Sequence, residues 1–505
     1  MDKTKLRVTD IITSKDIEEW QSNDVITISA GTGRGKSYFV KNELYKYAKA
    51  DNKKILMLLH RENCVKQFRR EIEKDGKQST IHVKTYQSLE YDLLHNKPVN
   101  LTQYKYICSD EFHYFLDDAN FNKTTDVSFN KILDSTFSIR IFMSATGEDM
   151  KKYINNIKKV DTKNYEIPLE FSFIRSLTFF HKDDSMAEFI REAIANGNKA
   201  IFFIQKASKA YKLYKQFKEH CLFNCSKYNR EYYKYVDKAK IDKMLDNEMF
   251  DEQILITTSC FDAGANIVDK NLKHIVVDIV DINSLIQCIG RKRIDYNDPN
   301  DKINLYVKAI NNQQLGGFES TTKRKLEMAE YLMHHTTQEL VDKYKRSIDY
   351  SGIIYDEVKA DSDNLDMCTK KVNQLMYLKK KLDIMDYQTM KEWGEFGYCK
   401  KLAYLFGFYD SDSRTFTYRT IGEDYALESY LENNLGNILF QRKDRKEIIE
   451  KIDVRSNGRL LKSISALNSA LKERKIMYMI VEFSTSTTID GKQKRYSNAW
   501  KIVKL

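Results

Sequence analysis

Residues 25–37 read Val-Ile-Thr-Ile-Ser-Ala-Gly-Thr-Gly-Arg-Gly-Lys-Ser, and this stretch decides the fold. Its first five residues are rich in β-branched apolar side chains, which predicts a buried strand. Glycines at positions 31, 33 and 35 then form a turn, and residues 38–50 have helical periodicity. Such a turn directs backbone N–H groups inward and the helix start adds positive potential, which predicts a phosphate-binding loop. The residues expected to form this loop are Ala30, Gly31, Thr32, Gly33, Arg34, Gly35, Lys36 and Ser37.

Two side chains of the loop carry specific expectations. Lys36 is placed to reach the outer phosphates of a nucleotide, and Ser37 is placed to ligate Mg²⁺. The usual first glycine of the pattern is Ala30 in this chain. The competing interpretation is a glycine-rich turn that precedes Lys-Ser by chance, so the residues downstream have to decide.

The composition fits a large soluble globular protein. The 505 residues allow two or three domains, and Lys and Arg (83) exceed Asp and Glu (72), which gives a net charge of +11. This excess suits a polyanionic partner, although a lysine-rich solvated surface would give the same count. The eight cysteines are scattered, and neither a signal peptide nor an apolar run of about 18 residues is visible. We therefore expect a cytoplasmic protein without a membrane partner.

Residues 1–162 alternate apolar runs with helical patterns, which predicts a parallel sheet with helices on both faces. The expected strands are residues 25–29, 55–59, 81–84, 104–109 and 139–144. Polar residues follow these strands, and ligands of such sheets lie beyond the carboxyl ends of the strands. Asp110-Glu111 is the strongest of these signals. In an ATPase the first carboxylate holds the water shell of the metal and the second polarises the attacking water, whereas a surface Asp-Glu turn is the alternative.

A second lobe is expected over residues 163–310, with strands at 199–204, 253–258 and 274–280. The helix expected over 206–219 carries Lys and Tyr on one face, a pattern typical of a solvated amphipathic surface. Gln287-Cys288-Ile289-Gly290-Arg291-Lys292-Arg293 supplies guanidinium groups after the last of these strands. An arginine from a second lobe can stabilise charge at the γ-phosphate held by the first, and it does so better than lysine.

Together these motifs resemble the core of a superfamily 2 helicase of the DExH type, over residues 20–310. The resemblance rests on the loop ending in Lys36-Ser37, on Asp110-Glu111-Phe112-His113, on Ser144-Ala145-Thr146, and on the stretches 257–266 and 287–293. It implies two tandem RecA-like P-loop NTPase domains that hold ATP and Mg²⁺. The catalytic residues that it implies are Asp110, Glu111, Gln287, Arg291 and Arg293, with Ser37 and Asp110 at the metal.

The resemblance also implies roles outside the catalytic set. Gly264 and Asn266 would contact the nucleotide, although Asn266 stands where Asp is more usual. Phosphates of a nucleic-acid strand would be held by Arg61, Thr85 and Thr258. Coupling between the two sites is implied for His113, Ser144 and Thr146. The stretch 287–293 resembles the family's sixth motif, Gln-x-x-Gly-Arg-x-x-Arg, but its last arginine arrives one residue early. This spacing is similar to that of some viral and phage DNA helicases. Arg291 is the first choice for the arginine finger, the residue that stabilises charge at the γ-phosphate, and Arg293 is the alternative.

The accessory C-terminal region, residues 311–505, lies outside the resemblance. It predicts a mostly helical domain, with helices at 323–344, 367–382 and 391–406. Residues 440–505 then give a short helix (446–452), a turn, a basic amphipathic helix (459–472) and a hairpin around Asp490-Gly491. This is the order of a winged-helix module, in which Arg459 and Lys462 would meet duplex DNA. A small domain that only braces the motor is the alternative.

These observations predict an ATP-dependent DNA helicase or translocase. The resemblance implies 3′ to 5′ movement on single-stranded DNA and at duplex junctions, with RNA as the other substrate class. Low proline and abundant Lys, Asn, Ile and Tyr indicate an AT-rich genome, in keeping with a phage or mobile element and its replication or recombination proteins. The alternative is a nucleic-acid-gated ATPase switch, or an RNA helicase, that binds or remodels without processive unwinding.

Overall fold

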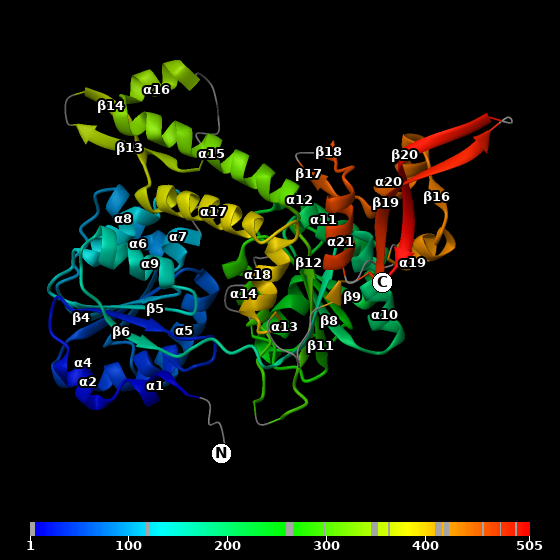
Figure 1. The fold of residues 1–505 in the computed structure, drawn as a ribbon. Helices are drawn as coiled ribbons and strands as arrows, with labels where there is room; N and C mark the ends of the chain where they lie inside the picture. Colours follow the sequence, from blue (N-terminus) through cyan, green and yellow to red (C-terminus); the bar gives the residue numbers. More distant parts are fainter. Residues whose placement is uncertain are drawn as a thin grey trace. The chain divides into compact units, whose positions relative to one another are not determined.

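A computed structural model describes most of the chain. The described residues are 6–117, 122–258, 266–296, 298–344, 352–361, 364–409, 417–418, 424–456, 459–474, 476–489 and 492–505. They fall into two compact units. The first unit contains the described residues up to 170 together with 320–385, and the second contains those between 171 and 319 and those from 386 onward. Figure 1 shows the ribbon.

The first unit is built on a parallel six-stranded sheet in the order β3-β2-β4-β5-β1-β6. All five strands expected from the sequence are present, and a sixth is added. The strands are β1 (Val25–Ser29), β2 (Lys54–Leu59), β3 (Ile81–Thr85), β4 (Tyr104–Asp110), β5 (Ile139–Ser144) and β6 (Lys163–Glu166).

Helices cover both faces of this sheet, because side chains of the strands point alternately to the two sides. Ile26 and Ile28 face one core and Val25 faces the other. The first face packs on α1 (Val8–Ile11), α2 (Ser14–Glu19), η1 (Phe39–Leu44), α4 (Tyr45–Ala50) and α5 (Glu62–Lys74), and the short α3 (Lys36–Tyr38) leads into η1. The second face packs on α6 (Tyr86–Leu94), α7 (Tyr114–Asp117), α8 (Thr125–Leu133), α9 (Glu148–Lys152) and η3 (Tyr153–Ile157).

The second unit contains a parallel seven-stranded sheet in the order β15-β7-β12-β11-β8-β10-β9. The strands are β7 (Ile174–Phe180), β8 (Lys199–Ile204), β9 (Cys221–Phe223), β10 (Ile254–Thr257), β11 (Leu272–Asp278), β12 (Ile303–Lys308) and β15 (Thr417–Tyr418). The helices around it are α10 (Asp184–Ala195), α11 (Ala207–Gln216), η4 (Lys218–His220), α12 (Arg230–Tyr233), α13 (Lys238–Asn247), α14 (Ile282–Ile289) and α18 (Gly397–Leu405). The two sheets confirm the expected pair of tandem RecA-like α/β domains.

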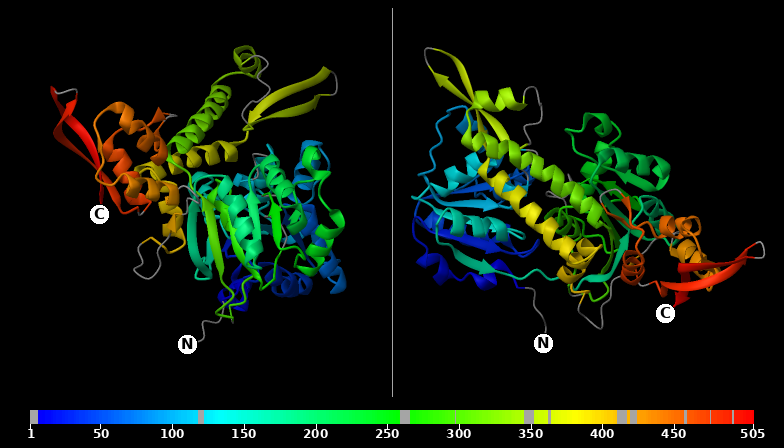
Figure 2. Two further views of the ribbon diagram at one scale, coloured as in Figure 1. Left: turned by 90° about the vertical axis from the view of Figure 1, so that its right-hand side faces the viewer. Right: turned by 45° about the horizontal axis from the view of Figure 1, so that its top comes forward.

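The region after residue 311 differs from the expected single accessory domain, because residues 320–385 group with the first unit. Leu375 is fully buried in the second-face core of the first sheet, and the Asn373 amide donates to Lys123 O at 2.9 Å. Figure 2 shows α15 and α17 running side by side. The elements here are α15 (Asn312–His334), α16 (Thr337–Tyr344), β13 (Ile354–Asp361), β14 (Asn364–Val372) and α17 (Gln374–Glu392).

The helix expected over 367–382 is wrong in its first part. Residues 364–372 form β14, which pairs with β13, and the helix begins only after Asn373. The Asn373 side chain accepts hydrogen bonds from the backbone N–H groups of Leu375 and Met376, at 3.0 and 3.1 Å. This cap fixes the helix start.

Residues 424–505 form a module with its own apolar core, and a three-stranded antiparallel sheet of order β16-β20-β19 lies on its helices. The expected short helix, basic helix and hairpin are present in that order, and a short strand pair (residues 455–456 and 459–460) lies between the two helices. The basic helix is shorter than the expected 459–472, because Ser463 caps it and residues 459–460 are extended. The elements are α19 (Asp424–Asn433), β16 (Ile438–Leu439), α20 (Arg442–Ile452), β17 (Arg455–Ser456), β18 (Arg459–Leu460), α21 (Ile464–Glu473), β19 (Tyr478–Ile489) and β20 (Lys492–Lys504).

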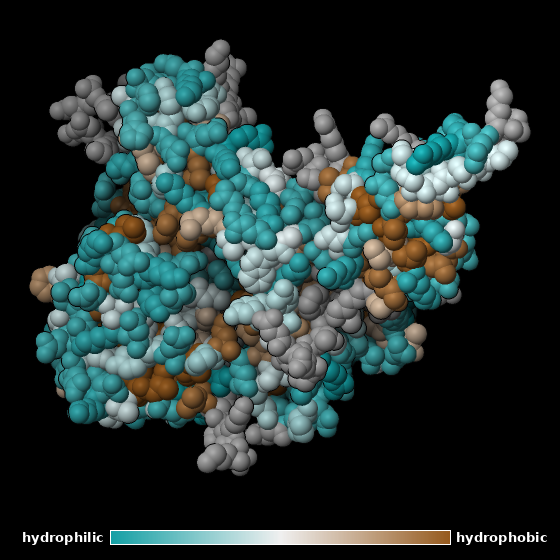
Figure 3. Space-filling model, viewed as in Figure 1, coloured by the Kyte–Doolittle hydropathy of each residue, from teal (hydrophilic) through white to brown (hydrophobic). Residues whose placement is uncertain are grey.

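Hydrophilic residues line the outer part of the β19–β20 hairpin, which projects from the module (Figure 3). Among the described residues, no helix has the length and apolar character that a bilayer-spanning segment needs.

Candidate active site

The glycine-rich loop lies at the carboxyl end of β1 and turns directly into a helix. Ala30 N donates to Ser144 O at 2.9 Å, which ties the start of the loop to the end of β5. Gly33 and Gly35 have left-handed φ angles of 73° and 87°, which side chains with a Cβ rarely adopt. Lys36 begins α3, and the helical stretch continues through η1 and α4 to Ala50. The local sequence therefore forms the expected strand, turn and helix.

The Lys36 ammonium lies at the centre of this loop. It is buried, donates to Ala30 O at 2.8 Å, and lies 3.9 Å from Glu111 Oε1. Glu111 follows β4, and β4 is separated from β1 in the sheet only by β5. The fold thus brings the P-loop lysine and the Asp110-Glu111 pair together at one edge of the sheet.

The two adjacent carboxylates occupy different backbone conformations. Asp110 is the last residue of β4, whereas Glu111 has a left-handed φ of 51°, uncommon for a residue with a side chain. Burial and the neighbouring Glu111 carboxylate raise the pKa of Asp110, and Lys36 opposes the shift. Tyr86 donates to Asp110 O at 2.9 Å and holds the strand end in place.

The residues at the loop fit a magnesium ion. Asp110 Oδ1 is shielded from solvent and has no hydrogen-bond partner among the described residues. An oxygen of this kind and the Ser37 hydroxyl match the hard donors that Mg²⁺ prefers. In the described part of the chain no three or more His, Cys, Asp or Glu side chains are arranged so that they alone could hold a metal ion, so a metal here would take its other ligands from phosphates and water.

A hydrogen-bonded chain joins the ends of β4 and β5. His113 Nδ1 lies 2.7 Å from Ser144 Oγ and 3.4 Å from a Glu111 carboxylate oxygen. Thr146 N donates to the same Ser144 hydroxyl at 3.0 Å. The three residues expected to couple the sites are therefore in one contact network with Glu111.

The N-terminal segment, through Leu6 and Val8, contacts the glycine-rich loop, a contact that the sequence did not predict. Val8 N donates to Arg34 O at 2.9 Å, and the Arg34 guanidinium donates to Leu6 O at 3.3 Å. Arg34 also lies 3.6 Å from the Glu170 carboxylate. The arginine inside the loop is therefore held from both sides and is a structural member of it.

In the second unit, the arginine motif lies on a short extended segment. Ile267 donates to Arg291 O and accepts from Arg293 N, each at 2.8 Å, so residues 291–293 bridge to Ile267 as a strand does. Side chains alternate along such a segment, which puts both arginines on the side opposite to Lys292.

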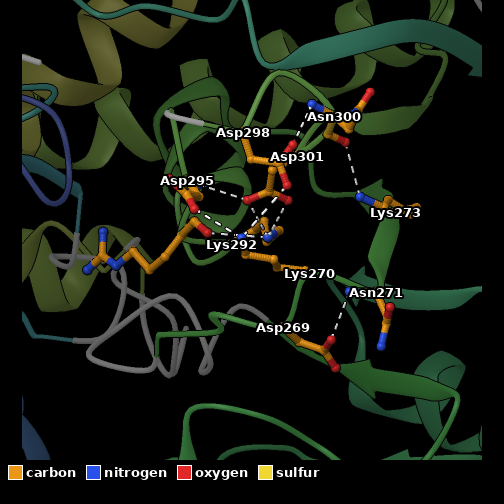
Figure 4. A network of polar contacts seen from close by, with 10 residues as sticks. Asp269, Lys270, Asn271, Lys273, Lys292, Asp295, Asp298, Asn300 and Asp301 are labelled. Atoms are coloured by element: carbon orange, nitrogen blue, oxygen red, sulfur yellow. Dashed lines mark hydrogen bonds and ion pairs between the residues drawn. The ribbon is translucent and has the colours of Figure 1, made fainter. Parts of the chain in front are cut away.

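Lys292 anchors the segment through its contact with Asp301, as Figure 4 shows. Its ammonium is buried 2.8 Å from Asp301 Oδ1, and Asp295 N donates to the same carboxylate at 2.8 Å. Arg293 donates to the Asn266 side-chain oxygen, and Asn266 donates to Glu248 at 3.0 Å. Arg291 Nε, by contrast, is buried without a hydrogen-bond partner among the described residues.

The remaining expected residues lie as follows. Thr85 caps α6 by accepting from Ser88 N at 3.0 Å, and Arg61 lies at the start of α5. Thr258 is buried after β10, and Gln287 lies in α14. Gly264 and the side chain of Arg459 lie outside the described residues, and Lys462 is exposed just before α21.

Comparison with known proteins gives similarities of fold. No protein-family model matches the chain, and no curated protein sequence matches it. Among solved structures, Saccharomyces cerevisiae Dbp5 bound to RNA and ADP BeF3 aligns at a TM-score of 0.42 and 16% identity, over 56% of this chain and 78% of that one. Mss116p bound to ssRNA and AMP-PNP aligns at a TM-score of 0.45 and 16% identity, over 59% of this chain and 68% of that one. Mycobacterium smegmatis helicase Lhr bound to ssDNA and AMP-PNP aligns at a TM-score of 0.42 and 12% identity, over 74% of this chain and 58% of that one. Similarities at this level describe the path of the chain and carry nothing about its substrate.

Proposed function

We propose that this protein is an ATP-driven nucleic-acid translocase or helicase. The observation that carries the proposal is the meeting of Lys36 and Glu111, 3.9 Å apart at the carboxyl edge of a parallel sheet, with Asp110 beside them. A glycine-rich loop, a lysine and adjacent carboxylates in this arrangement match what phosphoryl transfer from a nucleotide requires.

Each residue of the first unit has a role in this proposal. The loop N–H groups and Lys36 hold the phosphates, and Glu111 orients and deprotonates the attacking water. Ser37 and Asp110 would hold Mg²⁺, which neutralises phosphate charge when it is bound. His113 and Ser144, already bonded to each other, transmit movement of Glu111 to the end of β5.

The second unit supplies the finger. Arg291 is proposed for this role because its Nε has no competing hydrogen bond, whereas Arg293 is engaged by Asn266. A guanidinium kept free of partners can pair with phosphate oxygens as charge develops there. Gln287, which lies on the helix that leads into the motif, belongs to the same proposed face.

The finer parts of the proposal come from the sequence resemblance. DNA is the proposed polymer and 3′ to 5′ the proposed direction, within replication or recombination of a phage or mobile element. The module of residues 424–505 supports duplex contact: the exposed Ser465, Ser469 and Lys472 share one face of α21. Lys462 extends that face at the helix start.

The experiment is an ATPase assay with single-stranded DNA, duplex DNA and RNA in parallel, followed by strand displacement on a 3′-tailed duplex. Stimulation by single strands together with displacement supports the proposal. Stimulation without displacement would favour the gated switch. Turnover that ignores every polymer would refute both.

A further inference from the structure

A basic and aromatic surface stands apart from the motifs described above. Residues 209–240, which include most of α11 and all of α12, contain nine Lys and Arg and only three acidic residues. Their net charge of +6 is more than half of the +11 of the whole chain. The segment flanks β9, which is the edge strand of the second sheet. We call eight exposed basic and aromatic side chains of this segment the Tyr–Lys patch: Lys212, Lys215, Lys218, Tyr228, Arg230, Lys234, Tyr235 and Lys238.

The cations of the patch are not neutralised by carboxylates. None of its six Lys and Arg side chains forms an ion pair with any residue that the structure describes. Their neighbours differ, since Lys209 pairs with Asp183 and Asp278, and Lys240 pairs with Glu252. Surface lysines on other helices also pair along the helix, as Lys446 does with Glu450. The patch therefore presents six cations that form no ion pair with a carboxylate of the described residues.

The two aromatic side chains of the patch, Tyr228 and Tyr235, are exposed. Tyr235 stacks on Tyr211 with ring centroids 4.2 Å apart and planes at 21°, and Tyr211 also contacts Tyr232 at 5.6 Å. Tyr228 is 79% exposed, the highest value among the large apolar side chains of the described residues. The ammonium of Lys234 lies 5.1 Å from the centroid of the Tyr235 ring. The patch thus combines exposed aromatic rings with cations that have no carboxylate partner among the described residues.

We propose that the Tyr–Lys patch binds single-stranded nucleic acid as an accessory site, separate from the motor motifs and independent of ATP. Unpaired bases stack on exposed aromatic rings, and the phosphates between them meet the lysines. A duplex hides its base faces and an acidic protein offers none, so neither would use Tyr228. The proposal does not rest on the proposed ATPase, because it concerns binding alone.

The first test measures binding of a fluorescein-labelled 20-nucleotide oligothymidylate to the full chain without nucleotide. The double variant Lys212→Gln/Lys215→Gln should bind several-fold more weakly near 0.1 M salt. Its log–log salt slope should fall by about 1.4, that is about 0.7 for each phosphate that a lysine no longer neutralises. The matched control is Lys240→Gln/Lys243→Gln, which removes the same charge from two cations that already have carboxylate partners. Equal weakening in both double variants would overturn the proposal.

The second test separates stacking from charge. Tyr228→Ala should weaken oligothymidylate binding roughly tenfold, and Tyr228→Phe should restore it. Binding of a 20-base-pair duplex should be unaffected by either change. Equal effects on strand and duplex, or no effect of Tyr228→Ala, would overturn the proposal in favour of a general polyanion surface. Because no ATP is present, a chain that fails to hydrolyse ATP leaves this test intact.

Discussion

Lys36 and Glu111 lie 3.9 Å apart because the strands that carry them, β1 and β4, both flank β5. The parallel sheet brings the two carboxyl ends to one edge, and Asp110 Oδ1 is buried beside them. The Lys36 ammonium and the Glu111 carboxylate hold each other in place, and in the proposed function phosphate oxygens would compete for the lysine. This pair therefore yields two predictions with different signatures.

Replacing Lys36 by alanine should strongly weaken nucleotide binding. The ammonium makes charge-assisted hydrogen bonds, and losing one costs about 1.5–3 kcal/mol, which corresponds to roughly 10- to 150-fold weaker affinity. Fluorescent ATP-analogue titration measures the change. Lys41→Ala is the control, because Lys41 lies in the same helical stretch but pairs with Glu71 away from the loop. Undiminished nucleotide affinity in the Lys36→Ala variant would refute the assignment of residues 30–37 as a phosphate-binding loop.

Replacing Glu111 by glutamine should leave nucleotide binding intact and slow hydrolysis by roughly 10²–10⁴-fold, the usual contribution of a general base. Glutamine has the same length and accepts the left-handed φ no worse than glutamate. Single-turnover hydrolysis and analogue binding should be measured on one preparation. A variant with normal turnover would take the base role away from Glu111.

The strands and the loop could be predicted from sequence because buried parallel strands are continuous apolar runs bounded by polar residues. Contacts between distant segments could not. The sequence around Lys292 does not indicate that Asp301 forms its ion pair. The sequence around Leu375 does not indicate that this residue packs in the core of the first sheet. The cap at Asn373 was a legible signal, since Asn before a helical pattern marks a start, and it corrects the helix expected over 367–382.

Two neighbouring residues of the arginine motif should have different roles: Lys292 should stabilise the fold, and Arg291 should act in catalysis. Lys292→Ala leaves Asp301 charged and buried, so the unfolding free energy should fall by about 3–5 kcal/mol. Arg291→Ala should change stability little and lower turnover by roughly 10³-fold or more, as loss of an arginine finger does. Urea unfolding and ATPase assays on the two variants test this division. The reverse pattern, with turnover lost and stability kept in Lys292→Ala, would contradict the assignment.

Asp126 should make the first unit less stable as the pH rises. Burial raises the pKa of its carboxyl from 3.8 to about 7, so the native state binds the proton more tightly than the unfolded state. This penalty is absent below about pH 4, grows towards pH 7 and is complete above it, on the order of 4 kcal/mol at most. Asp126→Asn should remove it, so that the variant gains thermal stability over the natural protein at pH 8 but not at pH 4. Glu73→Gln, an exposed change on α5, is the control and should show no such difference.

Removing the terminal module tests whether it contacts duplex DNA or only braces the motor. The cut belongs after Tyr418, because β15 completes the second sheet, and a cut near residue 316 would also strip Leu375 from the first core. Residues 424–505 carry their own apolar core, so a chain that ends at 418 should keep its two sheets and its basal ATPase. Duplex affinity should fall and its salt slope should shrink by about 0.9 for each phosphate that the module neutralises. Lys462→Gln/Lys472→Gln in the full chain should reproduce part of that change without altering the fold, since both lysines are exposed at α21. A truncated chain with an unchanged salt slope would identify the module as a brace.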